Sequence, residues 1–259
     1  MKNYTVSACI VTYNSKDIIE RTIQSVLDFT KDVQLDFYVV DNASTDGTSE
    51  FIRTRFPQVT VIENKENVGF GAAHNKVLPL LKSKYHIVVN PDIILKNNAV
   101  LTLCDWADGH EEAGLLSPQI LFDDGRVQQL GKRNPTFRYL GSHRFHKGDE
   151  PSKTMREYCM LDAPLDRVTE ISNATGCFMF FRTSVFKEIK GFDERFFMYL
   201  EDCDIARRVS ESEKYKAYFF PMAEVTHLWE RESKRNKKLL LIHVRSIIKY
   251  FLKWGIRIW

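Results

Sequence analysis

The densest group of chemically useful side chains lies at Glu201, Asp202 and Asp204, where three carboxylates fall within four residues. They follow an aromatic run at residues 196–199 and open a helix expected over residues 205–209. A helix dipole favours negative groups in the first turn. Clustered carboxylates also raise one another's pKa, which suits a general base. The segment therefore predicts a catalytic base or, without chemistry, an acidic first turn anchored by aromatic residues.

Two further residues could hold a cation. Asp92 ends the turn Asn90-Pro91-Asp92 after an expected strand, and the proline stiffens that turn. One carboxylate, together with water and substrate phosphates, is a usual way to hold Mg²⁺. His227 follows an apolar stretch at residues 218–225 and offers an imidazole. Taken alone, each residue also fits a structural role, Asp92 as a helix cap and His227 as a core histidine.

A glycine turn at Gly69 and Gly71 precedes an expected helix that runs to about Leu81. The dinucleotide fingerprint would need a third glycine where His74 stands, and the turn follows the third strand rather than the first, so hydride transfer is disfavoured. The backbone N–H groups of such a turn can still approach a phosphate or a sugar. A tight turn without a ligand is the alternative.

Strand and helix signals alternate along the first 120 residues. Apolar runs predict strands at residues 6–12, 37–40, 59–62 and 86–89, with helices between them and Ser15 capping the first helix. This alternation predicts an α/β fold with a mostly parallel central sheet and helices on both faces. Ligands of such sheets bind beyond the carboxyl ends of the strands. Those ends carry residues suited to polar recognition: Thr12, Tyr13, Asn14, Asp41, Asn42, Asn67, Asn90 and Asp92.

Composition narrows the possible classes of protein. The 259 residues are 44% hydrophobic and 27% charged, which excludes global disorder, collagen and coiled coil. Five widely spaced cysteines without a CxxC pair argue against a disulfide framework or a structural zinc site. We expect no signal peptide and no membrane span, because the start shows no cleavage pattern and no run of about 18 apolar residues occurs.

The net charge of +3 is unevenly divided. Residues 231–259 hold nine Lys or Arg and one acid, whereas the rest holds 28 basic and 33 acidic groups. Residues 233–259 are predicted to form a basic amphipathic helix, with one broad apolar face made of Leu240, Val244, Ile247, Ile248, Phe251, Leu252, Trp254 and Ile258. Arg245, Lys249, Lys253 and Arg257 fall on the other face. This pattern is typical of a helix in a membrane interface; packing on the body is the alternative, and nucleic-acid binding lacks a fold motif.

Six segments, in this order, resemble the family 2 glycosyltransferases of the GT-A fold, most nearly bacterial rhamnosyltransferases of surface-polysaccharide biosynthesis. They are VSACIVTYNS (6–15), VVDNASTDGT (39–48), ENVGFGAAHN (66–75), VVNPDI (88–93), NATGCFMFFR (173–182) and GFDERFFMYLEDCDIARR (191–208). His227 completes the series. The expected organisation is a GT-A domain over residues 1–232, in which 122–170 form an acceptor-side loop region, followed by the membrane-associating helix at 233–259.

The resemblance implies a role for each matching residue. A nucleoside-diphosphate sugar would be bound by Thr12, Tyr13, Asn14, Asp41, Asn42, Asn67, Gly71, Asn75, Asn90 and Asp92. Asp92 matches the second acid of the family's DxD element, and Asn90 replaces the first, which lowers the charge available to a metal. Asp92 and His227 would hold Mg²⁺ or Mn²⁺. Asp202 matches the catalytic base, with Gly176 and Glu201 near the acceptor.

The implied activity is an inverting, metal-dependent transfer of a sugar, L-rhamnose from dTDP-rhamnose, onto a lipid-linked or growing cell-surface polysaccharide such as O-antigen. A UDP-hexose or UDP-N-acetylhexosamine donor remains open, as does a non-catalytic, membrane-associated binder of nucleotide sugars or glycans. The expected partners are the donor, a lipid-linked glycan and an anionic membrane contacted by residues 234–259, with no nucleic acid. The expected location is cytoplasmic, peripheral on the inner face of the bacterial plasma membrane.

Overall fold

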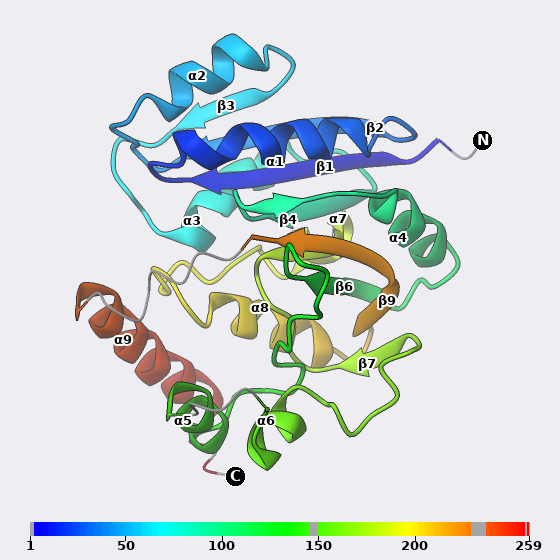
Figure 1. The fold of residues 1–259 in the computed structure, drawn as a ribbon, viewed down its shortest axis with the longest axis vertical. Coiled ribbons are helices and arrows are strands. Elements are labelled where there is room, and N and C mark those ends of the chain that lie inside the picture. The colour runs from blue at the N-terminus through cyan, green and yellow to red at the C-terminus, as the bar shows by residue number, and fades with distance from the viewer. Residues whose placement is uncertain (1–2, 146–149, 229–236, 257, 259) are drawn as a thin grey trace.

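One mixed sheet runs through the computed structural model, which describes residues 3–145, 150–228, 237–256 and 258 (Figure 1). The strand order is β3-β2-β1-β4-β8-β6-β9-β5, with β7 paired to β9. The first four strands along the chain are all parallel to one another: β1 (Thr5–Thr12), β2 (Gln34–Asp41), β3 (Thr60–Glu63) and β4 (Tyr85–Val89). Their carboxyl ends therefore meet at one edge, as the sequence predicts.

The later strands extend this sheet with antiparallel pairs that the sequence analysis did not anticipate. They are β5 (Ile93–Ile94), β6 (Ala113–Leu121), β7 (Thr169–Ile171), β8 (Phe178–Arg182) and β9 (Lys216–His227). Strand β8 runs antiparallel between β4 and β6, whereas β6 and β9 are parallel. Strand β5 pairs antiparallel with the end of β9, so that Ile93 lies opposite His227.

Helices cover both faces of the sheet, as predicted. One face packs against α1 (Lys16–Asp28), α2 (Thr48–Arg55) and α4 (Ala99–Asp108). The other face packs against α3 (Phe70–His74), the 3-10 helix η1 (Asn75–Leu80), α7 (Thr183–Glu188) and α8 (Glu201–Ser210). Strand β1 alternates accordingly, because Ile10 joins the first core and Cys9 and Val11 join the second.

The predicted cap of the first helix is wrong in its chemistry. Ser15 stands at the N-cap of α1, but its hydroxyl donates to the Tyr13 carbonyl at 3.3 Å and caps nothing. Asp46 does this work, because its carboxylate accepts the Lys16 N–H at 3.1 Å and the Thr48 N–H at 3.0 Å. One acid thus serves the first turns of both α1 and α2 and ties their loops together.

The region between β6 and β7 carries two short helices, α5 (Phe137–Phe145) and α6 (Lys153–Tyr158), and the chain ends on α9 (Lys237–Trp254). Helix α9 lies beside α5 and α8 (Figure 1), and its Tyr250 and Phe251 join a small core with Phe196, Leu200 and Cys203. Residues 233–236, predicted to be helical, lie outside the described residues.

The predicted division of α9 into an apolar and a basic face is only partly right. Phe251 is buried as part of the core beneath the helix, whereas Leu252, from the same predicted face, is 80% exposed. Lys253 turns inward to ion pairs with Asp193 and Asp204, both at 2.7 Å. One side of the helix therefore packs on the body of the protein, which was the alternative to a membrane-bound helix.

All five cysteines are free and buried, in agreement with the expectation that no disulfide forms. Among the described residues, every helix is too short or too polar to cross a bilayer.

Candidate functional site

The loops after β1 and β2 lie side by side at the carboxyl edge of the sheet. The Asn42 N–H donates to the Thr12 carbonyl at 2.8 Å, and the Asn14 side-chain oxygen accepts the Thr45 N–H at 2.8 Å. The Thr12 hydroxyl oxygen is buried and has no hydrogen-bond partner, while the ring of Tyr13 is 52% exposed. The exposed ring of Tyr13 offers a surface on which a planar base can stack.

Asp41 and Asn42 are both only 3% exposed and fix the loops around them. The Asp41 carboxylate accepts the Ser44 N–H at 3.0 Å and also the Ser44 hydroxyl. The Asn42 amide donates to the Gly69 carbonyl at 3.1 Å and accepts from the Asn64 amide at 2.9 Å. These contacts hold the glycine turn against the end of β2.

The glycine turn approaches the segment before α8 so closely that a side chain at Gly69 would clash. Gly69 has φ +90, and a Cβ there would lie 2.1 Å from the Phe197 carbonyl oxygen. The Phe70 N–H donates to that same oxygen at 2.9 Å. Asn67 supports the turn by accepting the Gly69 N–H at 3.0 Å.

Gly71 and Asn75 contact the protein's own chain. A Cβ at Gly71 would lie 2.7 Å from the Phe192 Cβ. Asn75 pairs with the Phe192 backbone through both its amide atoms, each at 2.9 Å, and donates to Glu194 at 3.0 Å. Both residues thereby brace the segment that leads to the acidic cluster, and their donor-binding role stays a prediction.

The structure brings Asp92 and His227 together from positions far apart in the chain. The His227 Nε2 lies 3.2 Å from the Asp92 Oδ2, and the side chains are 9% and 19% exposed. The other oxygen, Asp92 Oδ1, is buried without a hydrogen-bond partner. This pairing follows from the antiparallel contact of β5 with the end of β9 and from the bond of the Leu228 N–H to the Asp92 carbonyl at 3.0 Å.

Gln128 sets the orientation of His227 and was missed by the sequence analysis. Its amide nitrogen donates to the carbonyls of Leu121 at 3.2 Å and His227 at 2.9 Å, so its oxygen must face the His227 Nδ1, 3.1 Å away. The Nδ1 therefore carries a proton, and Nε2 is the nitrogen that faces Asp92. In the neutral ring, Nε2 and the carboxylate are both acceptors, and a proton or a metal cation between them satisfies both.

The pair fits a divalent cation that takes its remaining ligands from elsewhere. Within the described ranges there is no group of three or more His, Cys, Asp and Glu side chains that could hold a metal ion. The unpartnered Asp92 Oδ1 and the Nε2 lone pair of His227 are nevertheless the donors that Mg²⁺ or Mn²⁺ accepts, and substrate phosphates can complete the shell.

Asp202 is held by backbone N–H groups at the start of α8. Its Oδ2 accepts the Gly176 N–H at 2.9 Å, and its Oδ1 accepts the Cys203 N–H at 2.8 Å. Burial raises the pKa of this carboxyl, and the two N–H donors offset part of the rise. A raised pKa makes the carboxylate a stronger base than an ordinary aspartate.

Two residues in the left-handed region direct the carboxylates. Tyr199 has φ 71 and Leu200 has φ 64, and Leu200 is the N-cap of α8. Non-glycine residues adopt this conformation at a cost of about 1–3 kcal/mol, and such residues cluster at functional sites. Glu201 follows at 5% exposure with its Oε2 unpaired, and burial first and the charge of Asp202 second raise its pKa well above the usual range.

The pair Asp92 and His227 and the carboxylate of Asp202 come together near one residue, Cys177. The Asn90 N–H donates to the Cys177 carbonyl at 2.8 Å, and Gly176 is the neighbour that binds Asp202. Burial raises the pKa of the Cys177 thiol, and the negative charges of Asp92 and Asp202 both add to that rise. Asp92, Asn90, Asp202 and Gly176 therefore lie near one another, and their shared catalytic role stays a prediction.

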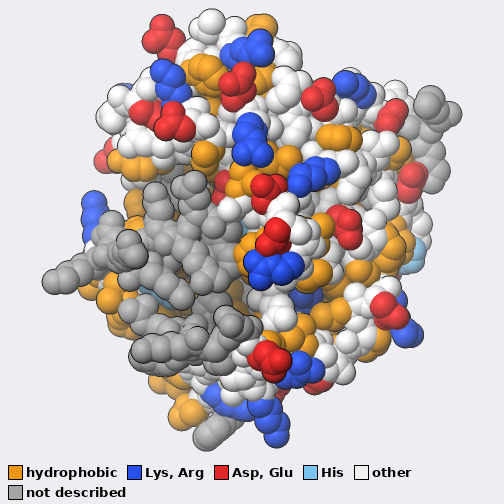
Figure 2. Space-filling model, in the orientation of Figure 1, with side chains coloured by type: hydrophobic (Ala, Val, Ile, Leu, Met, Phe, Trp, Pro, Cys, Tyr) orange, Lys and Arg blue, Asp and Glu red, His pale blue; other side chains and the backbone are white. Residues whose placement is uncertain are grey.

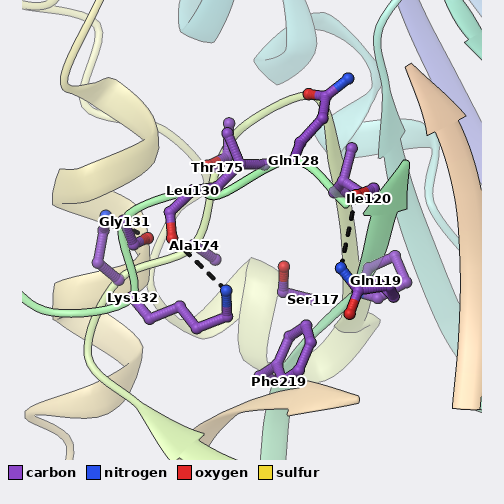
Figure 3. Close-up of a pocket in the computed structure, with 12 residues that line it drawn as sticks. Ser117, Gln119, Ile120, Gln128, Leu130, Gly131, Lys132, Ala174, Thr175 and Phe219 are labelled. Atoms are coloured by element: carbon purple, nitrogen blue, oxygen red, sulfur yellow. Dashed lines mark hydrogen bonds between the residues drawn. The ribbon is translucent and has the colours of Figure 1, made fainter. Parts of the chain in front are cut away.

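Of two cavities among the described residues, the smaller borders the site, because Gln128 and Thr175 line it. Figure 3 shows one enclosed by Lys132, Ser117 and Phe219, with a volume of about 10 Å³, enough for about one water molecule. A larger groove of about 540 Å³ lies at Ser210 and Glu211, at the opposite end of α8 from Asp202. Neither Asp92 nor Asp202 lines either cavity.

Comparison with known proteins shows what the chain is similar to. A family described as "Glycosyl transferase family 2" matches residues 7–190. An N-acetylglucosaminyl-diphospho-decaprenol L-rhamnosyltransferase of Mycobacterium tuberculosis is 28% identical over 228 residues, covering 84% of this chain and 74% of the relative. Rhamnosyltransferase WbbL of Escherichia coli is 26% identical over 195 residues, covering 71% and 70%.

Solved structures confirm the predicted GT-A fold. A mannosyltransferase of Pyrobaculum calidifontis, in complex with GDP-Man and Mn²⁺, has a TM-score of 0.68 at 17% identity and covers 98% of this chain. GalNAc-T7 with UDP, GalNAc and Mn²⁺ has a TM-score of 0.66 at 15% identity and covers 95%. This chain spans 64% of the first of these solved chains and 48% of the second.

The buried Glu201 predicts an unusual dependence of stability on pH. In the unfolded chain it ionises near its ordinary pKa, but in the fold it stays protonated to higher pH, so its contribution to stability falls as pH rises above about 4.5. Glu201→Gln removes this loss. We expect its free energy of unfolding to exceed that of the wild type by a margin that grows from pH 4.5 to 8, as measured by chemical denaturation.

The matched control is Glu66→Gln, at an exposed position. Its difference from the wild type should not grow over the same pH range. A Glu201→Gln variant that loses stability relative to the wild type as pH rises would contradict the assignment.

Proposed function

The chain belongs to glycosyl transferase family 2, and on that premise we propose that it is an inverting, metal-dependent glycosyltransferase that uses Asp202 as its base. The observation that carries the proposal is the arrangement around Cys177. There a carboxylate with a raised pKa, Asp202, lies beside Gly176. A second carboxylate near the same residue, Asp92, has one oxygen facing His227 and the other without a hydrogen-bond partner.

The sugar we propose is L-rhamnose, donated by dTDP-rhamnose. The names of the two relatives described above support it, since both are rhamnosyltransferases. Thr12, Tyr13 and Asn14 would border the base and ribose, and the buried carboxylate of Asp41 would accept the N–H of a pyrimidine ring. A UDP-hexose or UDP-N-acetylhexosamine donor is the alternative that has the same pyrimidine contact.

In the proposed reaction, Asp202 accepts the proton of an acceptor hydroxyl as that oxygen attacks the anomeric carbon. The bond from this carbon to the diphosphate oxygen breaks, and the diphosphate leaves with the electron pair. The attack comes from the face opposite the leaving group, so the configuration inverts. Gly176 would hold the base in position through its N–H, and Glu201, favoured in its neutral form, would add no second negative charge beside it.

The cation is proposed to be Mg²⁺ or Mn²⁺, bound by Asp92 and His227 together with the donor. When bound, it would neutralise the charge that develops on the departing diphosphate. Asn90 replaces the first acid of the family's element, so the protein contributes one carboxylate and one imidazole at this position. Gln128 would keep the Nε2 of His227 available by holding the proton on Nδ1.

The acceptor is proposed to be a lipid-linked glycan of cell-surface polysaccharide biosynthesis. The printed name of the mycobacterial relative, which includes a decaprenol diphosphate, supports this class. Such an acceptor would place the enzyme at the cytoplasmic face of the bacterial plasma membrane. The region at residues 122–170 would then shape the acceptor side.

Asp202→Asn tests the base directly. The amide oxygen can still accept the Gly176 N–H, but the side chain cannot take a proton at neutral pH. We expect the rate of sugar transfer to fall by about 10²–10⁴-fold, while donor affinity measured by calorimetry stays within about threefold. A variant that transfers sugar at the wild-type rate would contradict the assignment, and a wild type that binds donor but never transfers would favour the non-catalytic binder.

The donor is tested by a thermal-shift panel of dTDP-rhamnose, UDP-glucose, UDP-N-acetylglucosamine and GDP-mannose with Mg²⁺ or Mn²⁺. Binding to the folded form raises the melting temperature according to the ratio of concentration to Kd. We expect the largest shift with dTDP-rhamnose. A larger shift with a UDP-sugar would replace the rhamnose assignment and leave the family unchanged.

Gln128→Ala tests the positioning of the metal ligand. Loss of an outer hydrogen-bond partner typically lowers metal affinity by about 10–100-fold. We expect this decrease when Mn²⁺ is titrated calorimetrically into the protein saturated with dTDP, with the donor's metal-independent affinity unchanged. The control is Gln129→Ala, at the exposed neighbouring position; equal Mn²⁺ affinities in the two variants would refute the role.

A further inference from the structure

Helix α9 presents two different apolar surfaces. Its inner surface packs on the body, where Tyr250 and Phe251 are 0% and 4% exposed and contact Leu200 and Cys203. The Ser246 hydroxyl also donates to the Met198 carbonyl at 2.8 Å. These contacts bury the inner surface and fix which side of the helix faces away from the protein.

The outer surface carries a second apolar row. Its members follow helical spacing and are 51%, 42%, 53% and 80% exposed: Leu241, Val244, Ile248 and Leu252. Ile256 and Ile258, which follow the helix end, are also exposed, at 72% and 57%. Figure 2 shows hydrophobic side chains at the lower left margin of the molecule, where α9 lies in Figure 1. We define these six residues as the outer row.

Positive charge lies along one margin of the outer row. Arg245 and Lys249 are exposed beside it, although the Lys249 ammonium also donates to the Arg195 carbonyl of the body. The sequence of α9 contains no Asp or Glu. A row of large apolar side chains with cations at its edge matches the boundary between acyl chains and anionic headgroups. A second copy of the chain fits less well, because a two-fold contact through this row would bring the positive charges of the two copies together.

We propose that the outer row of α9 inserts into the interface of an anionic lipid bilayer and orients the enzyme there. This inference deepens the proposed function and rests on it for the lipid-linked acceptor. The binding of the outer row to a bilayer does not itself depend on the transfer reaction. Because the inner surface of α9 contacts Leu200 and Cys203, the docked helix would hold the turn that carries Asp202 close to the membrane. The two surfaces thus couple docking to the position of the base.

The test is sedimentation of the full chain with vesicles of phosphatidylcholine and phosphatidylglycerol in a 3:1 ratio. We expect binding that weakens at least tenfold in Ile248→Ser/Leu252→Ser, since two exposed apolar side chains are removed from the interface. Arg245→Gln/Lys249→Gln should weaken binding about fivefold per charge. Pure phosphatidylcholine vesicles should bind the wild type less than the anionic vesicles do.

The matched control is Leu80→Ser/Met222→Ser, which removes two exposed apolar side chains away from α9, 44% and 53% exposed. It should sediment like the wild type, and thermal melting should show that all variants fold. Wild-type protein that stays in the supernatant, or an Ile248→Ser/Leu252→Ser variant that sediments equally, overturns the proposal.

A dimer in analytical ultracentrifugation that the same double variant dissociates would assign the row to a second copy instead. Transfer to a water-soluble acceptor reports on the reaction separately from docking.

Discussion

The hydrogen bond from the Gly176 N–H to the Asp202 carboxylate, 2.9 Å long, is the contact on which the site depends. It joins the loop before β8 to the first turn of α8, and there is no room to spare, since a Cβ at Gly176 would lie 3.0 Å from the Asp202 Cβ. The glycine therefore allows the approach and its backbone supplies the donor. The next residue, Cys177, binds Asn90 through its carbonyl, so the same loop also sets the distance between the base and the Asp92 turn.

The edge predicted to bind the donor does a second, structural task. Asn42 holds the glycine turn, the turn receives the Phe197 carbonyl, and Asn75 holds the backbone of Phe192. All of these contacts brace the segment that ends in the left-handed pair Tyr199 and Leu200. A strained turn persists only where its surroundings determine it. The edge predicted to bind the donor thus helps to maintain the geometry of Asp202, the proposed base. This arrangement gives a physical reason for both to be built from neighbouring loops.

The features of the fold and of the site that could be predicted are those that leave a local pattern in the sequence. Apolar runs gave the parallel strands and hence the polar edge, because burial on both faces leaves a pattern in the sequence. Gln128 leaves no such pattern in the sequence. The role of a single glutamine in a loop can be recognised only when β9 brings His227 beside it. The positive φ angles of Tyr199 and Leu200 could not be predicted, because neither residue is a glycine. The pairing of Asp92 with His227 came from the family resemblance, since no spacing rule joins residues so far apart. Periodicity likewise predicted the helix α9 but could not tell which of its apolar side chains the body would cover.

The position of Lys253 shows why α9 cannot be understood from its net charge. This lysine, expected on a solvent-facing basic face, lies 2.7 Å from both Asp193 and Asp204. Asp204 is fully buried and also accepts the Trp254 indole N–H at 2.8 Å and the Arg208 guanidinium at 2.9 Å. A buried carboxylate needs such partners, because its desolvation is costly when one of them is removed. Two of the three come from α9, and Asp204 stands two residues from Asp202. The boundary predicted at residue 232 therefore separates stretches of sequence that share a core and an ion-pair network, and the basic charge of the last helix partly serves the acidic turn that carries the base.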